Sequence, residues 1–398
     1  MKRNIQTYDE KDSRIDYGVI FPVLVLALIS IATLLATTYF QVSQGSLRPA
    51  LLQVAWYVVG TIAVVVIMQF DSEQLWKLTT WAYFIGLGLL VAVLFLYDRE
   101  TAILTGARSW FSVGSISFQP SEIVKISYIL MLAKVVTQHN VATKRKTTRT
   151  DFMLLCKLIL WALPPLALVI LQNDLGTTLV FISILGGILI MSGITWKILL
   201  PLILTVAAVG ALLIYLVVYN RQILLSLGFK NYQFGRIDSW LDPYRDQAGD
   251  GFQLFQSLKA IGSGQITGKG FGVSEVYVPV RESDLIFATI GENFGFIGGC
   301  ILILVYFILI YQMIRVCFDT KNEFYTYIAT GVIMMILFHV VENIGMTIGL
   351  LPLTGIPLPF ISQGGSSLLG NMMGIGLIMS MRYHYKSYIF EDKEERAL

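Results

Sequence analysis

Long apolar runs recur along almost the whole chain, and they constrain its fold more than any other feature. Ten segments are apolar over a length able to cross a bilayer. They are residues 17–40, 51–69, 78–97, 123–137, 154–171, 175–192, 196–219, 285–314, 325–349 and 361–381. Of the 398 residues only 14% are charged, which excludes an ordinary soluble domain. The sequence therefore predicts an all-α, polytopic membrane protein of about ten transmembrane helices in one integral membrane domain.

The distribution of Lys and Arg sets the expected orientation, because these residues are retained on the cytoplasmic side of short loops. An inside N-terminus puts the tails 1–16 and 383–398 and the basic run 144–149 in the cytoplasm. The large segment 220–284, between spans seven and eight, then lies outside; long loops translocate largely regardless of charge. The first 16 residues are polar and the first apolar run is of full spanning length, unlike a cleavable signal peptide.

One carboxylate stands where a long polar stretch turns abruptly into an apolar span. Asp284 lies in Val280-Arg281-Glu282-Ser283-Asp284-Leu285-Ile286-Phe287-Ala288. A carboxylate that loses hydration at the mouth of an apolar helix has a raised pKa and is a better base. The alternative is that Asp284 caps the helix that follows, where an anion is favoured. The position alone favours the cap, and chemistry at the membrane surface is the competing interpretation.

A second polar group precedes and enters the fourth span. Glu122 and Lys125 are three residues apart, share a helix face, and are expected to pair and to point into the bundle or a wet cavity. A pair that only fixes helix packing is the equally favoured alternative. Arg108 could hold a phosphate and Trp110 a sugar face, although Trp at this depth is also a common interfacial anchor. The candidate substrate-binding residues of this segment are Arg108, Trp110, Gln119, Ser121, Glu122 and Lys125.

The large segment 220–284 has a polar, aromatic half and a glycine-rich half. Asp242, in Trp240-Leu241-Asp242-Pro243, is a further candidate substrate-binding residue. Residues 251–261 have the apolar spacing of a short amphipathic helix lying on the membrane. The run 262–272 superficially resembles a phosphate-binding loop, but its glycine spacing is wrong and no strand precedes it. We therefore interpret this run as a flexible turn that returns the chain to the membrane.

The segment between the ninth and tenth spans is apolar but too rich in proline for a regular helix. It reads Leu351-Pro352-Leu353-Thr354-Gly355-Ile356-Pro357-Leu358-Pro359-Phe360-Ile361-Ser362-Gln363-Gly364-Gly365-Ser366-Ser367. Irregular backbone at membrane depth is tolerated where it is buried in protein or lines a cavity, so this loop predicts a cavity wall. Gly364, Gly365, Ser366 and Ser367 would start a helix whose free amides can hold a pyrophosphate, or a plain capped helix. The candidate substrate-binding residues of this segment are Gln363, Ser366 and Ser367. His339 is interpreted as a packing residue, and Glu292 and Glu342 as members of a buried polar network.

The 354–367 stretch resembles the signature of the SEDS family (shape, elongation, division and sporulation). Five further stretches resemble family motifs in the family's order: Gly106–Trp110, Gln119–Lys125, Asp174–Thr177, Trp240–Pro243 and Ser283–Ala288. The opening Ser13–Gly18 is similar to the elongation (RodA) branch rather than to the division (FtsW) branch. Two positions depart from the pattern: Gln363 stands where a tyrosine is frequent, and Asn173 where a proline is frequent.

This resemblance implies a peptidoglycan glycosyltransferase that polymerises lipid II outside the cytoplasmic membrane during cell elongation. Asp284 matches the family's catalytic aspartate and is expected to act as general base. Arg108, Lys125 and Arg281 are the candidate cations for the departing pyrophosphate. The implied partners are lipid II, the growing glycan strand, a class B penicillin-binding protein and other membrane proteins of the elongation complex, with no nucleic acid.

No metal ligand set is evident in the sequence, and no cofactor is required, although a divalent cation remains compatible with the chemistry. The three histidines and three cysteines are scattered, so neither an imidazole or thiolate metal site nor a disulfide framework is indicated. The alternatives are a lipid II flippase, a division-type polymerase, and a scaffold that only activates its partner. A transporter would need polar groups spread along a path across the bilayer.

Overall fold

The computed structural model describes residues 15–40, 47–114, 116–143, 145–226, 231–245, 249, 251–320 and 322–394. These residues form fourteen helices and one two-stranded antiparallel sheet. The elements are α1 (Tyr17–Phe40), α2 (Arg48–Met68), α3 (Ser72–Leu96), α4 (Arg99–Thr105), β1 (Phe111–Val113), β2 (Ile116–Phe118), α5 (Pro120–Ala142), α6 (Thr148–Leu171), α7 (Leu175–Met191), α8 (Trp196–Tyr219), α9 (Arg221–Ser226), α10 (Asn231–Leu241), α11 (Phe252–Gly264), α12 (Ile286–Asp319), α13 (Glu323–Thr347) and α14 (Gly365–Glu394).

Each of the ten predicted spans coincides with one long helix, which confirms the all-α membrane fold. Among the described residues, seven helices are long and apolar enough to cross a membrane, α7 is a shorter apolar helix, and the more polar α5 and α14 complete the set. Several helices begin or end away from the predicted boundaries: α3 begins at Ser72 and α6 at Thr148, each six residues before the predicted span. The fourth span starts earlier, at Pro120, because proline fits the first helical turn. The tenth starts later, at Gly365, because residues 361–364 belong to the loop before it.

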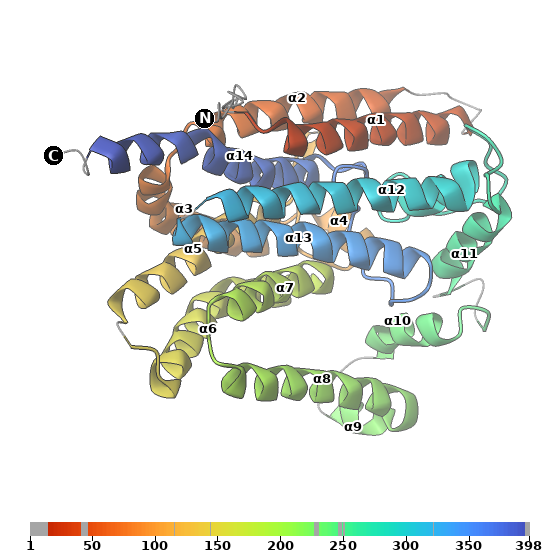
Figure 1. The fold of residues 1–398 in the computed structure, drawn as a ribbon. Helices are drawn as coiled ribbons and strands as arrows, with labels where there is room; N and C mark the ends of the chain where they lie inside the picture. Colours follow the sequence, from red (N-terminus) through yellow and green to blue (C-terminus); the bar gives the residue numbers. More distant parts are fainter. Residues whose placement is uncertain are drawn as a thin grey trace, which may run out of the picture.

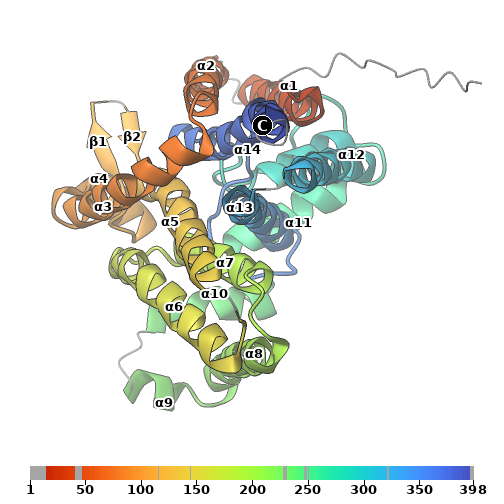
Figure 2. The same ribbon diagram turned by 60° about the vertical axis from the view of Figure 1, so that its left-hand side comes forward.

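The long helices run roughly along one direction, with α5 and α13 in the middle of the bundle (Figures 1 and 2). Most of α5 is buried, and so is 61% of the most apolar 18-residue stretch of α13, because both helices pack on neighbours around their circumference. In contrast, α8 lies at the margin, and only 6% of the corresponding stretch of α8 is buried. The N-terminal end of α1 and the C-terminal end of α14 lie at one end of the bundle, and α10 and α11 lie at the other (Figure 1).

The predicted amphipathic helix in the large segment exists as α11, but its apolar face packs on other helices, whereas the sequence predicted a helix lying on the membrane. Leu254, Ser257 and Ala260 are buried, and the Ser257 hydroxyl donates to the Thr347 carbonyl at 2.8 Å. The apolar face that suggested a membrane-surface helix is therefore packed against α12 and α13. The short helices α9 and α10 occupy the preceding part of the same segment.

The glycine-rich run after α11 is a tightly packed strut, not the flexible turn that the sequence suggested. It lies against a break in α12, where Gly295 has a φ of 63°. The break frees peptide groups of α12, and the run binds them: Lys269 N donates to Glu292 O at 3.0 Å and Phe296 N donates to Gln265 O at 2.9 Å. A β-carbon at Gly268 would lie 2.1 Å from the Asn293 carbonyl oxygen, so the approach requires glycine.

Candidate active site

Asp284 lies in a tight turn that directly precedes α12. Ser283 N and Leu285 N both donate to the Val280 carbonyl, at 3.2 and 3.4 Å, which folds residues 280–285 into this turn. We call residues 280–285 the aspartate turn. The N-cap residue of α12 is Leu285, and no side chain caps this helix. The interpretation of Asp284 as a helix cap is therefore wrong, and its carboxylate is left for another role.

The surroundings of Asp284 favour a proton acceptor. The side chain is half-buried, and burial raises its pKa to about 6, partly offset by a hydrogen bond from the Ser283 side chain. A carboxyl group with this pKa is still mostly ionised at neutral pH but is a stronger base than an exposed aspartate. The competing interpretation, a partly dehydrated carboxylate at the mouth of an apolar helix, agrees with this geometry.

The proline-rich loop between α13 and α14, residues 348–364, forms one wall beside the aspartate turn. The Asn343 amide donates to the carbonyl of Asp284 at 2.7 Å and to that of Ile356 at 2.8 Å, so it joins the turn to the loop. Gly355 of the loop faces the catalytic candidate directly, since a β-carbon there would lie 3.3 Å from Asp284 Oδ2. We call residues 348–364 the wall loop.

Further contacts fix the wall loop on both sides. The Ser362 hydroxyl donates to the Ser283 carbonyl at 2.6 Å, and Gln363 N donates to the Glu282 carbonyl at 2.8 Å. On the bundle side, the hydroxyls of Tyr57 and Tyr306 donate to the carbonyls of Phe360 and Pro359. Phe360 has a φ of 63°, a conformation that a bulky residue keeps only when its surroundings hold it. The loop is irregular but rigidly bonded.

Polar residues around Asp174 lie beside the wall loop, where α5, α7 and α14 begin; we call them the Asp174 group. Asp174 caps α7 by accepting from Thr177 N at 3.0 Å, and it accepts from Gln119 Nε2 at 2.7 Å. Gln119 N in turn donates to the Ser366 hydroxyl at 3.0 Å. Asp174 is half-buried and was not among the predicted site residues, although the motif Asp174–Thr177 contained the signal.

The predicted pair of Glu122 and Lys125 forms inside the bundle. Lys125 Nζ lies 2.8 Å from Glu122 Oε2 and both side chains are buried. Lys125 Nζ also lies 3.1 Å from His339 Nε2, so this histidine belongs to a buried polar triad rather than to apolar packing alone. A β-carbon at Gly370 of α14 would lie 2.8 Å from the Glu122 carbonyl oxygen, which explains a small residue there.

The remaining candidate residues are distributed around these groups. Arg108 is exposed with its guanidinium 5.3 Å from the Tyr97 ring centroid, and Trp110 is half-buried. Asp242 is exposed at the end of α10 and accepts from Tyr244 N at 3.2 Å. Arg281 is buried and faces Glu292, at 3.2 Å. Ser121 is buried, and Gln363 and Ser367 are half-buried.

The structure does not bring all predicted site residues into one contact group. Gln119 and Ser366 are joined directly, the backbone of Gln363 is bonded to the aspartate turn, and Glu122 with Lys125 forms its own group. Within the described ranges, no three or more His, Cys, Asp or Glu side chains are grouped to hold a metal ion.

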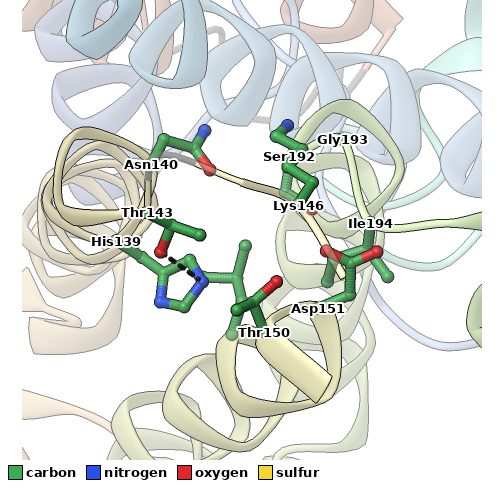
Figure 3. Close-up of a pocket in the computed structure, with 10 residues that line it drawn as sticks. His139, Asn140, Thr143, Lys146, Thr150, Asp151, Ser192, Gly193 and Ile194 are labelled. Carbon is green, nitrogen blue, oxygen red and sulfur yellow. Dashed lines mark hydrogen bonds between the residues drawn. The ribbon is translucent and has the colours of Figure 1, made fainter. Parts of the chain in front are cut away.

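A separate polar pocket lies at the other end of α5, between α5, α6 and the turn from α7 to α8 (Figure 3). Its lining includes His139, Lys146 and Asp151. Two of these side chains already have partners: His139 Nδ1 lies 3.4 Å from Lys157 Nζ, and Asp151 Oδ2 accepts from Thr195 N at 3.0 Å. The pocket is nearly the full length of α5 away from Gln119, so it is not part of the Asp284 site.

The fold and site define a class: a polytopic α-helical membrane protein with a base-like carboxylate where one helix enters the bundle. Residues 15–387 match the cell cycle protein family of FtsW, RodA and SpoVE, and the chain belongs to this family.

Two relatives and one solved structure show how close the likeness is. The chain is 31% identical over 370 residues to the peptidoglycan glycosyltransferase MrdB of Escherichia coli K12, covering 92% of this chain and 94% of MrdB. It is 33% identical over 331 residues to the stage V sporulation protein E of Bacillus subtilis 168, covering 81% and 84%. A chain from a peptidoglycan synthase complex that coordinates polymerization and crosslinking superposes with a TM-score of 0.76, at 25% identity, covering 92% and 97%.

Proposed function

We propose that this protein is a peptidoglycan glycosyltransferase that polymerises lipid II into glycan strands at the outer face of the cytoplasmic membrane. The observation that carries the proposal is Asp284: a half-buried carboxylate with a pKa of about 6, next to the rigid wall loop and where α12 enters the bundle. The relatives named as peptidoglycan glycosyltransferases support the same reaction.

The proposed reaction is an inverting transfer. Asp284 accepts the proton from the sugar 4-hydroxyl of an incoming lipid II, and the oxygen of that hydroxyl bonds to the anomeric carbon of the growing strand. The bond from that carbon to undecaprenyl pyrophosphate breaks, and the electron pair leaves with the pyrophosphate. General-base assistance of this kind contributes about 10²- to 10⁴-fold. The lipid tails stay in the bilayer while the sugars reach the aqueous border, which is the place that Asp284 occupies in this proposal.

Of the three candidate cations, Arg108 is the best suited to the pyrophosphate. Its side chain is exposed. Its backbone lies close to Asp174, because Arg108 N donates to the carbonyl of Gln172, two residues before Asp174, at 2.8 Å. Lys125 and Arg281 are buried, and each is paired with a glutamate. We keep a divalent cation as an optional contributor, which chelation during an activity assay would reveal.

The orientation and partners form part of the same proposal. We propose that both tails lie in the cytoplasm, which the positive-inside pattern supports. Residues 1–14 and 395–398 lie outside the described residues, including Ser13 and Arg14 of the elongation motif. A class B penicillin-binding protein is the proposed partner, supported by the likeness to a chain of a synthase complex that couples polymerization to crosslinking. We propose the elongation role rather than division, with lipid II and the growing strand as substrates.

Reconstitution tests this function against transport. Purified protein and its cognate transpeptidase are given lipid II, and glycan strands are resolved on gels beside an Asp284→Ala variant. We expect strands from the wild type and none from the variant. Strands of equal yield from both proteins would reject Asp284 as the base, lipid II translocation without strands would establish the flippase alternative, and strands from the partner alone would leave this chain a scaffold.

A further inference from the structure

Glu292 is a buried carboxylate, eight residues after Asp284, that the proposed reaction does not use. It accepts hydrogen bonds from two backbone amides and three side chains. The donors are Lys269 Nζ (3.2 Å), Glu275 N (2.9 Å), Val276 N (3.1 Å), Ser274 Oγ (3.0 Å) and Arg281 Nη2 (3.2 Å). A carboxylate with this many donors is held in its ionised form and in one place. Every donor comes from the segment that leads to Asp284.

Arg281 completes a ring of contacts with Glu292, Ser274 and Val276, which we call the ring around Glu292. Besides the Glu292 carboxylate, its guanidinium binds the Ser274 hydroxyl and the Val276 carbonyl, the latter at 3.1 Å. The side chain is buried, so its charge depends on Glu292 for compensation. Burial lowers the pKa of Arg281 and the charge of Glu292 opposes that shift. Arg281, the second residue of the aspartate turn, is thus tied to α12 by its side chain.

The backbone at this point is strained, and the ring explains how the strain is held. Val280, directly before Arg281, has a φ of 52°. A β-branched residue rarely adopts this conformation, and it persists only where surrounding contacts over-determine it. The wall loop and Asn343 hold the carbonyls of Glu282, Ser283 and Asp284 from one side. Glu292, through Arg281, holds the turn from the other.

We propose that Glu292 is a positioning residue for Asp284, fixing the aspartate turn through Arg281 so that the carboxylate points toward the bound sugar. Glu292 itself touches neither substrate nor the reacting atoms. The inference rests on the proposed function for its catalytic readout, whereas the order of the turn can be measured without any substrate.

The test uses Glu292→Gln, which keeps the size of the side chain and an acceptor for the two amides but removes the charge that binds Arg281. Lipid II polymerisation by the complex with the transpeptidase is expected to lose about 10- to 100-fold in kcat, the usual cost of a misplaced catalytic group. The KM for lipid II is expected to stay within about threefold, because the substrate-binding groups are untouched. Hydrogen exchange at Ser283 and Leu285 should accelerate while exchange in α13 does not.

Two matched variants separate positioning from stability. Glu275→Gln removes an exposed carboxylate that binds the same Lys269, at 2.9 Å, and should leave kcat within about twofold. The double variant Glu292→Gln with Arg281→Met removes both buried charges, so its thermal stability should recover relative to Glu292→Gln alone, while kcat stays low.

The outcomes separate this inference from the proposed function. Wild-type kcat in Glu292→Gln, kcat recovering together with stability in the double variant, or exchange rising evenly along all helices would overturn the positioning role. If the wild type polymerises and Asp284→Ala does not, the proposed function survives any of these results. If Glu292→Gln cannot be purified, Arg281→Lys is used: it keeps the charge pair but loses the contacts to Ser274 and Val276, and unchanged turn exchange and kcat in it would also overturn the inference.

Discussion

Asp284 and Glu292 are two carboxylates on one short stretch of chain, and the fold treats them in opposite ways. Glu292 is fully buried and bound by five donors, two of which carry positive charge. Asp284 is half-buried, with a hydrogen bond from Ser283 that only partly offsets the rise of its pKa to about 6. Pairing removes basicity and gives rigidity, whereas partial dehydration without an opposite charge gives basicity.

Because the two carboxylates are bonded so differently, we expect a mutation of Glu292 to reduce stability and a mutation of Asp284 to reduce activity. Removing a fully paired buried carboxylate leaves donors and a buried cation unsatisfied, which costs stability. Removing a dehydrated and weakly bonded carboxylate relieves a desolvation cost and removes a function. Active sites often keep a reactive group although it lowers the stability of the protein, and Asp284 fits this description.

The largest effect is expected from Asp284→Asn. Glycan polymerisation should fall about 10²- to 10⁴-fold, because the amide cannot accept the sugar proton. Thermal stability should not fall: the folded-state pKa of Asp284 is above its ordinary value, so ionisation of this group opposes folding as pH rises toward neutrality, and the amide removes that cost. The same exchange at Asp98, which caps α4, is the control and should retain activity. A large fall in melting temperature for Asp284→Asn would erase the distinction between the two carboxylates.

The next largest effect concerns the close packing of α11 against the part of α12 that carries Glu292. A β-carbon at Gly264 would lie 1.9 Å from the Gly291 carbonyl oxygen, so Gly264→Ala must separate α11 from α12. We expect the free energy of unfolding to fall by about 2–3 kcal/mol. Thermal denaturation in detergent measures this loss. Gly262→Ala is the matched control in the same helix: a β-carbon there meets no atom within 4 Å, and alanine should be neutral or stabilising by about 0.5–1 kcal/mol. Equal stability of the two variants would show that the glycine-rich run is not a rigid strut.

A pH profile sharpens the other side of the comparison. Because Asp284 must be ionised to accept a proton and its pKa is about 6, kcat should fall as pH drops through this value. At about pH 5 roughly one-tenth of the plateau activity should remain. The residual activity of Asp284→Asn should show no such acid limb. An acid limb of the same midpoint in that variant would assign the titration to another group.

Much of the fold could be predicted from the sequence, because membrane spans depend on apolar length, which is a local property. The break in α12 at Gly295 could not be predicted, since it depends on peptide groups of residues 265–270 that pair with it across the fold. The same long-range pairing turned a glycine-rich run from an expected flexible turn into a packed strut. Glycine permits both outcomes, and only the neighbouring backbone decides between them.

The site was predictable where a residue type alone carries the signal and not where partners decide. Asp284 was singled out by its place between polar and apolar sequence, but that place alone favoured a helix cap, and the family resemblance pointed to a base. The Glu122–Lys125 pair was predicted by helical spacing. Arg281 was predicted as a free cation for pyrophosphate, but its partner Glu292 lies well inside the next helix, beyond what spacing can show. That same contact ties the turn before α12 to the helix itself.

The smallest effect, and the finest test of how the aspartate turn is held, is expected from Val280→Gly. Valine at a φ of 52° is strained, and glycine relieves that strain by about 1 kcal/mol. The unfolded state gains entropy with glycine, which offsets about 0.5–1 kcal/mol, so the net change in unfolding free energy should lie within about 1 kcal/mol of zero. If the ring around Glu292 fixes the turn, kcat should change little, because the backbone geometry is imposed by Arg281 and the wall loop. Val280→Ala, which keeps a β-carbon and most of the strain, is the comparison variant. A loss of kcat in Val280→Gly with wild-type activity in Val280→Ala would instead show that backbone stiffness at residue 280, and not the Glu292 anchor, holds Asp284 in place.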